Sequence, residues 1–222
     1  MIDAYEVGGV EAGFDRFADL FNTEFEFAKE CHGFTHTLGN MTYDDYTAGK
    51  EFDVTDQIAF CSYGFFHGFM ESLAFETGDY EGSREFCDYI ESKLGGTIAS
   101  VGPCIHGIGH GVSDATDPRI HGQPRKLIDP GLALCKRLSR TQYEEKICAT
   151  GVFNALSEHY TSGELGFEYD ANDPYAICRD ESEPHIREAC YEDLKTLIYY
   201  LADDKLHKAV EYVVAIEEDD RR

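Results

Sequence analysis

The chain has 222 residues, 42% of them hydrophobic, which is enough to bury one substantial core. Its 43 acidic and 19 basic residues give a formal net charge of -24, so its surface should repel phosphate backbones and anionic lipid headgroups. This charge argues against binding of nucleic acid or of a membrane surface. It leaves two explanations for the acidity open, a saline habitat or cationic partners.

The chain contains no run of about 18 or more apolar residues, so we expect no membrane span. Its first residues have neither a basic start nor an apolar segment, so we expect no signal peptide within this chain. The start could be that of a mature or trimmed protein.

Apolar residues recur at three- and four-residue steps, whereas sustained alternation of apolar and polar residues is nearly absent, so the sequence predicts an all-α protein. An amphipathic helix is expected over residues 11–29 and onward to Cys31, and Gly39 and Asn40 should end or bend it. Residues 115–129 are expected to be irregular and 131–138 to form a short helix. Thr141 and Glu144 form a capping box. The motif-bearing helices are expected near residues 25–40, 56–77, 103–114, 141–160 and 184–201, and residues 217–222 should form a frayed, charged tail.

One five-position pattern returns along the chain: a cysteine followed by a glycine, a histidine, a second glycine and an acid. Its central copy is Cys104, Gly107, His110, Gly111 and Asp114. The neighbouring copies are Cys61, Gly64, His67, Gly68 and Glu71 before it, and Cys148, Gly151, Asn154, Ala155 and Glu158 after it. An earlier half-copy consists of Cys31, His32, Gly33 and His36, and a last copy keeps only Cys190. A period of about 43 residues is typical of a structural repeat, so we expect tandem helix hairpins in one domain over residues 1–222.

The eight cysteines fall on both sides of the junctions between a shorter helix and the motif helix that follows. Spacings of roughly 12 to 17 residues suit disulfides that staple helix hairpins. The repeat symmetry predicts the pairs Cys87–Cys104, Cys135–Cys148 and Cys178–Cys190, and leaves Cys31–Cys61 as the fourth. Zinc ligation in a reducing compartment is the alternative, but no Cys-x-x-Cys spacing occurs. Disulfides predict an oxidising, extracytoplasmic location, either secreted or periplasm-like.

Small residues four positions apart lie on one face of each motif helix: Gly64 with Gly68, Gly107 with Gly111, and Gly151 with Ala155. A glycine inside a helix costs about 0.5–1 kcal/mol relative to alanine, so their recurrence needs a reason. Close approach of neighbouring helices supplies one. We therefore expect the motif helices to face one another.

Histidines accompany these small residues in two columns of equivalent positions. One column contains His36, His67, His110 and Asn154, and the other contains His32 and His106. Because two histidines four residues apart on a helix can hold one metal ion, we predict that His36, His67 and His110 surround a metal site. His32 and His106 would complete that site or form a second one. The alternative is a buried polar network of histidines with Glu71, Asp114, Glu158 and tyrosines that specifies packing.

Imidazole and carboxylate ligands suit zinc, copper, iron or nickel rather than magnesium or calcium. Three histidines with an open fourth position would form a catalytic type of site, in which the pKa of bound water falls. Glu71, one turn beyond His67, could then act as a general base or orient a ligand. We find no nucleophile elbow, phosphate-binding loop or dinucleotide fingerprint in the sequence.

In architecture the chain resembles tandem helix-hairpin repeats of the tetratricopeptide kind over roughly residues 14–201, with a longer period and with disulfide staples. This resemblance carries no functional residues across. The sequence predicts an extracytoplasmic metal-binding helical repeat protein, which would be a metalloenzyme or a metal carrier. The alternative is a metal-free acidic scaffold that binds a protein partner.

Overall fold

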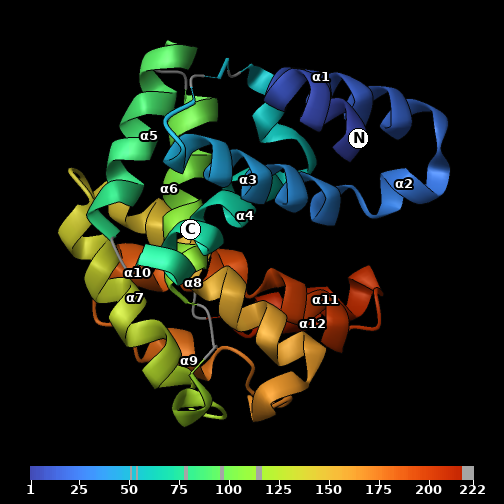
Figure 1. The fold of residues 1–222 in the computed structure, drawn as a ribbon. Coiled ribbons are helices and arrows are strands. Elements are labelled where there is room, and N and C mark those ends of the chain that lie inside the picture. The colour runs from blue at the N-terminus through green and yellow to red at the C-terminus, as the bar shows by residue number, and fades with distance from the viewer. Residues whose placement is uncertain (51, 54, 78–79, 96–97, 114–116, 217–222) are drawn as a thin grey trace. The chain divides into compact units, whose positions relative to one another are not determined.

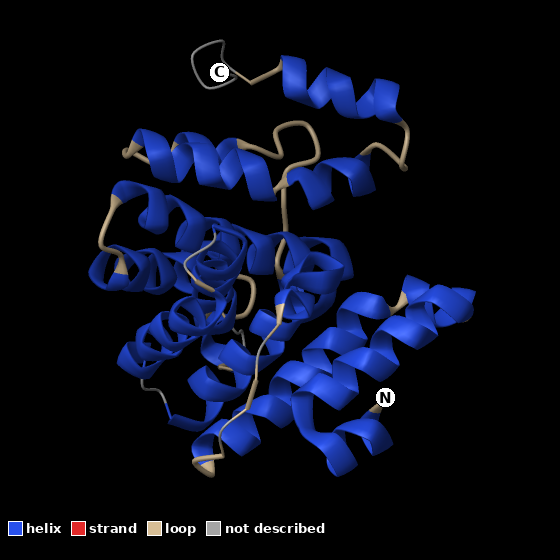
Figure 2. Ribbon diagram, turned by 90° about the horizontal axis from the view of Figure 1, so that it is seen from above, coloured by secondary structure: helices blue, strands red, loops and turns tan. Residues whose placement is uncertain are grey.

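A computed structural model describes the chain except for residues 51, 54, 78–79, 96–97, 114–116 and 217–222. The described residues form twelve α-helices and three short 3-10 helices, and no strand occurs among them (Figures 1 and 2). The all-α prediction is confirmed. Asp114 and the expected tail at 217–222 lie outside the described residues, and the period of the repeat stays a prediction.

The chain divides into two compact units, Met1–Val112 and Ser113–Arg222. The first contains α1 (Ile2–Thr23), α2 (Phe25–Lys29), α3 (Cys31–Thr47), α4 (Phe60–Thr77), α5 (Tyr80–Leu94) and α6 (Ile98–Val112). The second contains α7 (Pro124–Leu138), α8 (Gln142–Ser162), α9 (Ala176–Arg179), α10 (Pro184–Asp193), α11 (Lys195–Leu201) and α12 (Leu206–Val214). The expected single domain over residues 1–222 stays a prediction.

Helix α4 is the centre of the first unit. Its consecutive residues Phe65 and Phe66 are both fully buried, which means that the helix is covered on more than one side. It packs against α3 and also against α6. Phe69 adds a stacked contact with Phe86 of α5, with ring centroids 3.5 Å apart. Burial of each such ring contributes roughly 1.5–3 kcal/mol, so the aromatic side chains of α4 hold its neighbours around it.

Glycines let α3 and α6 approach the backbone of α4, as the sequence predicts. A Cβ atom added at Gly68 would lie 2.1 Å from the His36 carbonyl oxygen, and one at Gly64 would lie 2.5 Å from the His32 carbonyl oxygen. On the α6 side, a Cβ atom at Gly111 would lie 2.8 Å from the Met70 carbonyl oxygen. No side chain fits at these positions, so the packing prediction is confirmed for them.

The expected end or bend at Gly39 and Asn40 is wrong, because α3 continues to Thr47 with no non-helical residue inside it. A Cβ atom at Gly39 would lie 2.1 Å from the Phe65 carbonyl oxygen. This glycine therefore belongs to the same close contact between α3 and α4. A glycine does interrupt α1, where Gly9 has a φ of 72° and kinks the helix.

Two prolines also lie inside helices where the sequence predicts boundaries. Helix α6 begins at Ile98 and contains Pro103. Helix α7 begins at Pro124, within the stretch expected to be irregular, and contains Pro130. Proline at the first helical position is favourable, and an interior proline removes one backbone hydrogen bond. The helices therefore extend beyond the boundaries that the prolines suggest.

All four disulfides form in the predicted pairing, Cys31–Cys61, Cys87–Cys104, Cys135–Cys148 and Cys178–Cys190, with Cα atoms 5.4 to 5.8 Å apart. The described residues contain no free cysteine. Four disulfides are typical of a protein that folds in an oxidising, extracytoplasmic environment.

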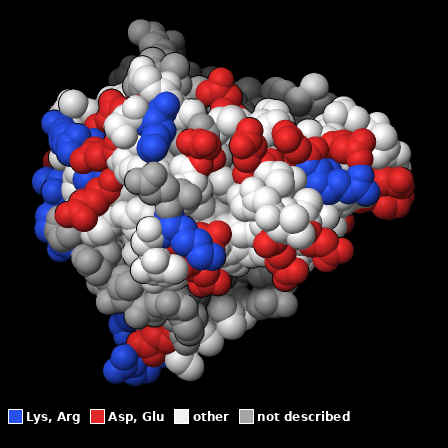
Figure 3. Space-filling view, turned by 45° about the horizontal axis from the view of Figure 1, so that its top comes forward, with Lys and Arg blue, Asp and Glu red and all other residues white. Residues whose placement is uncertain are grey.

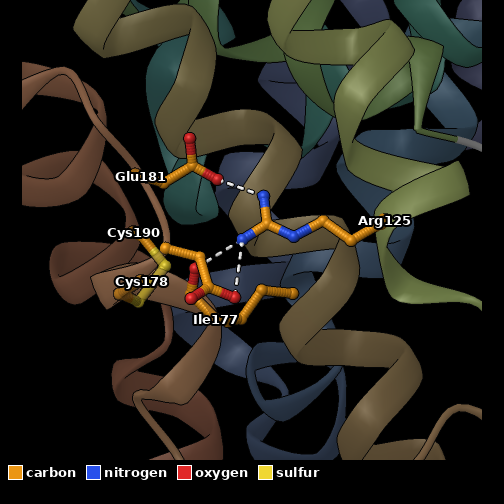
Figure 4. Close-up of a disulfide and its surroundings, with 6 residues drawn as sticks. Arg125, Ile177, Cys178, Glu181 and Cys190 are labelled. Atoms are coloured by element: carbon orange, nitrogen blue, oxygen red, sulfur yellow. Dashed lines mark hydrogen bonds and ion pairs between the residues drawn. A yellow bond between two sulfur atoms is a disulfide. The ribbon is translucent and has the colours of Figure 1, made fainter.

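In the second unit, Arg125 of α7 reaches the segment between α9 and α10 beside the Cys178–Cys190 disulfide (Figure 4). Its Nη1 donates to Glu181 Oε1 at 2.5 Å and its Nη2 donates to the Ile177 carbonyl at 2.9 Å. At the start of α8, Thr141 Oγ1 accepts a hydrogen bond from the Glu144 backbone N–H at 3.1 Å, which confirms one half of the predicted capping box. The Glu144 carboxylate accepts from the Arg140 backbone N–H at 2.7 Å rather than from that of Thr141. These contacts fix how the helices of this unit begin and join.

Acidic side chains are spread over the face drawn in Figure 3, with fewer basic ones among them. This distribution follows from the formal charge of -24. Among the described residues, no helix is both long and apolar enough to cross a membrane.

Candidate metal centre

Five histidines from three helices converge in the first unit. We call His32 and His36 of α3, His67 of α4, and His106 and His110 of α6 the histidine cluster. The His67 ring lies at its middle, with centroids 5.1 Å from His32, 5.3 Å from His36, 5.2 Å from His106 and 4.2 Å from His110. This convergence results from the glycine contacts that bring α3 and α6 against α4.

The two α3 histidines point their Nε2 atoms at each other, 3.1 Å apart. His32 Nδ1 lies 2.8 Å from the Cys61 carbonyl oxygen, which can only accept a hydrogen bond, so Nδ1 carries the proton. His36 Nδ1 likewise faces Glu71 Oε2 at 3.4 Å. In the tautomer with the proton on Nδ1, the lone pair of each ring lies on Nε2. Two lone pairs at this distance repel each other unless a proton or a metal ion lies between them.

His67 is 2% exposed, and neither of its ring nitrogens has a hydrogen-bond partner among the residues that the structure describes. Burial, followed by the nearby imidazoles of His110, His106, His36 and His32, lowers its pKa well below the ordinary histidine value. A buried imidazole without partners costs free energy. A metal ion bound to one of its nitrogens would supply the missing partner for that atom.

Glu71 connects two sides of the cluster. Its Oε2 faces His36 Nδ1 at 3.4 Å, and its Oε1 faces His110 Nδ1 at 3.1 Å. Burial alone would raise the pKa of Glu71, but the contacts with His110 and His36 outweigh burial and hold its pKa at about 2. A carboxylate of this kind orients the imidazoles that it contacts. Because so low a pKa makes a weak proton acceptor, the geometry favours orientation, and the general-base role of Glu71 stays a prediction.

The tightest group of potential ligands differs from the predicted one. Donor atoms of His32, His36 and His67 all lie within 4.8 Å of one another, whereas the sequence columns grouped His110 with His36 and His67. Helices α3 and α6 both pack against α4, and the ring centroids of His36 and His110 are 6.3 Å apart, farther than either ring is from His67. His110 stacks on His67 and faces Glu71, and His106 also lies against His67. Their role as ligands stays a prediction.

Asn154, which shares a column with three of these histidines, belongs to the copy that begins at Cys148 and lies in the second unit. Of the remaining histidines, His185 Nε2 lies 3.2 Å from Glu145 Oε2 and His159 stacks on Phe167 with centroids 5.1 Å apart. These pairs give no sign of a second convergent group among the described residues.

The lowered pKa of His67 predicts acid sensitivity of the metal-free protein. As the pH falls below about 6.5, the unfolded chain binds a proton that folded His67 resists, so stability is lost by up to about 1.4 kcal/mol per pH unit. Urea unfolding of chelator-treated protein between pH 8 and pH 5 measures this slope. His67→Asn should flatten it, and an unchanged slope would contradict the assignment. Glu71 acts in a separate window, because its contribution is lost only as the pH falls from about 4.5 toward 2.

No protein-family model, no curated protein and no solved structure matches this chain. The interpretation of its function therefore depends on the geometry of the histidine cluster.

Proposed function

We propose that this chain is an extracytoplasmic, disulfide-stapled helical protein that binds one transition-metal ion through His32, His36 and His67. The single observation that carries the proposal is the 3.1 Å separation of His32 Nε2 and His36 Nε2, with both Nδ1 atoms facing acceptors. Two nitrogens that each lie about 2.0–2.1 Å from a tetrahedral zinc ion would be about 3.3–3.4 Å apart. The observed pair needs only a small adjustment to reach that spacing.

The surroundings of the three imidazoles have the character of a metal site. Ligand histidines usually donate their second ring nitrogen to a carbonyl or a carboxylate, and Cys61 and Glu71 provide these acceptors. An all-imidazole set suits zinc, copper or iron. Three protein ligands would leave a fourth position for water or a substrate in a metalloenzyme, or for a ligand of a partner in a metal carrier.

The proposal is tested by titrating chelator-treated protein with Zn²⁺ and measuring metal per chain after gel filtration. One ion per chain is expected for the parent. A His185→Gln variant, which changes a histidine outside the cluster, should bind equally. Undiminished binding by a folded His32→Gln, His36→Gln, His67→Gln triple variant would refute the site.

A metal-free scaffold for a protein partner remains the second candidate, and one observation favours it. Helix α12 leaves Leu206, Val210 and Val214 at 69%, 49% and 59% exposure. Apolar side chains gathered on a surface often mark an interaction site. Under this alternative, the histidine cluster is a packing network, and the purified protein retains no stoichiometric metal.

A further inference from the structure

The Cys31–Cys61 disulfide adjoins the proposed metal site. Cys31 begins α3 and directly precedes His32, while Cys61 lies in the first turn of α4. The Cys61 carbonyl is also the acceptor that holds the proton on His32 Nδ1. The disulfide therefore restrains the group that keeps His32 Nε2 available as a ligand.

The backbone at Cys61 is held in a conformation that it would not adopt freely. Cys61, Ser62 and Tyr63 have φ values of 53°, 55° and 67°. A left-handed turn of residues other than glycine costs roughly 1–2 kcal/mol per residue, and it persists only where its surroundings enforce it. The bond to Cys31 is the covalent restraint on this turn. If the bond opens, this restraint on the turn is lost, and with it the restraint on the Cys61 carbonyl that His32 contacts.

This disulfide also differs from the other three in its access to solvent. The six cysteines of the other pairs are each at most 1% exposed. Cys31 and Cys61 are partly exposed. Thiol–disulfide exchange requires that a thiolate reach a sulfur atom, so a reductant meets Cys31–Cys61 first.

We propose that the Cys31–Cys61 disulfide is a redox switch that sets the metal affinity of the histidine site, an inference that rests on the proposed function. In exchange with a dithiol, one thiolate attacks a cysteine sulfur, the protein S–S bond breaks, and the second thiol closes the reductant's own disulfide. Two electrons and two protons pass from the dithiol to Cys31 and Cys61. The relaxed turn then no longer orients His32, and the ion is held by two fixed ligands instead of three.

The test compares the Zn²⁺ affinity of three proteins. These are the unsubstituted parent, a Cys31→Ser, Cys61→Ser double variant and a Cys178→Ser, Cys190→Ser double variant. The Cys178→Ser, Cys190→Ser double variant is the matched control, because it removes a disulfide from the second unit. We expect affinity to fall about 10- to 100-fold in the first double variant, as for loss of a group that orients a ligand, and to stay unchanged in the control. A folded Cys31→Ser, Cys61→Ser protein with the parent's affinity would overturn the switch and leave the proposed function standing. A parent that binds no Zn²⁺ would refute the proposed function itself.

A second measurement tests the redox switch if the Cys31→Ser, Cys61→Ser variant does not fold. Zinc-loaded parent is treated with increasing amounts of a phosphine, which reduces a disulfide and becomes a phosphine oxide with oxygen from water. Thiols are mapped by mass spectrometry and released zinc is measured at each step. Release in step with the thiols of Cys31 and Cys61 supports the switch. Zinc that stays bound until the buried disulfides open contradicts it.

Discussion

Replacing Gly68 by alanine is expected to destabilise the first unit by about 3 kcal/mol and to lower its melting temperature by more than about 10 °C. The added Cβ atom would lie 2.1 Å from the His36 carbonyl oxygen and 2.7 Å from Asn40 Oδ1. A backbone atom cannot move aside as a flexible side chain can, so α3 and α4 must separate. Thermal and urea unfolding measure the loss.

Gly33→Ala is the matched control for this change. Both glycines lie in helices and follow a histidine of the cluster directly, but a Cβ atom at Gly33 would meet nothing within 4 Å. Alanine should therefore stabilise the chain there by about 0.5–1 kcal/mol through its higher helix propensity. Equal stability of the two variants would show that the close contact between α3 and α4 is not formed.

Replacing His32 by glutamine is expected to weaken Zn²⁺ binding by about 100-fold, because one of three ligands is lost. At a free Zn²⁺ concentration of 100 times the parent's Kd, binding stabilises the parent by about 2.7 kcal/mol and such a variant by only about 0.4 kcal/mol. Unfolding with and without Zn²⁺ measures both quantities.

The repeat provides the control, since His106 occupies the position in the third motif helix that His32 occupies in α3. His106→Gln should keep most of the stabilisation by Zn²⁺, because His106 lies outside the group whose donor atoms converge. If His106→Gln abolishes binding and His32→Gln does not, the ion is held on the α6 side of His67 instead.

The helices, the disulfide pairing and the convergence of histidines could be predicted because each depends on local spacing. Glycines four residues apart, as at Gly64 and Gly68, indicate a close helix contact whatever the partner helix is. Cysteines on both sides of a hairpin junction indicate a bond across it. Equivalent positions such as His36 and His67 then meet because their helices do.

The composition of the tightest group could not be predicted in this way. Repeat symmetry treats His110 as equivalent to His36, but the two lie on different helices that pack against α4, and the orientation of each ring is set by its own contacts. The acceptor of His32 is the Cys61 carbonyl, which is placed by a left-handed turn that no periodic pattern reveals. Gly39 shows the same limit, because its role depends on its contact with Phe65 rather than on its helix propensity.

X-ray absorption spectroscopy of the zinc-loaded protein tests the central claim most directly. We expect three imidazole nitrogens at about 2.0–2.1 Å from the ion, and the loss of one of them in His32→Gln but not in His106→Gln. A coordination shell of oxygen atoms with at most one imidazole would contradict it.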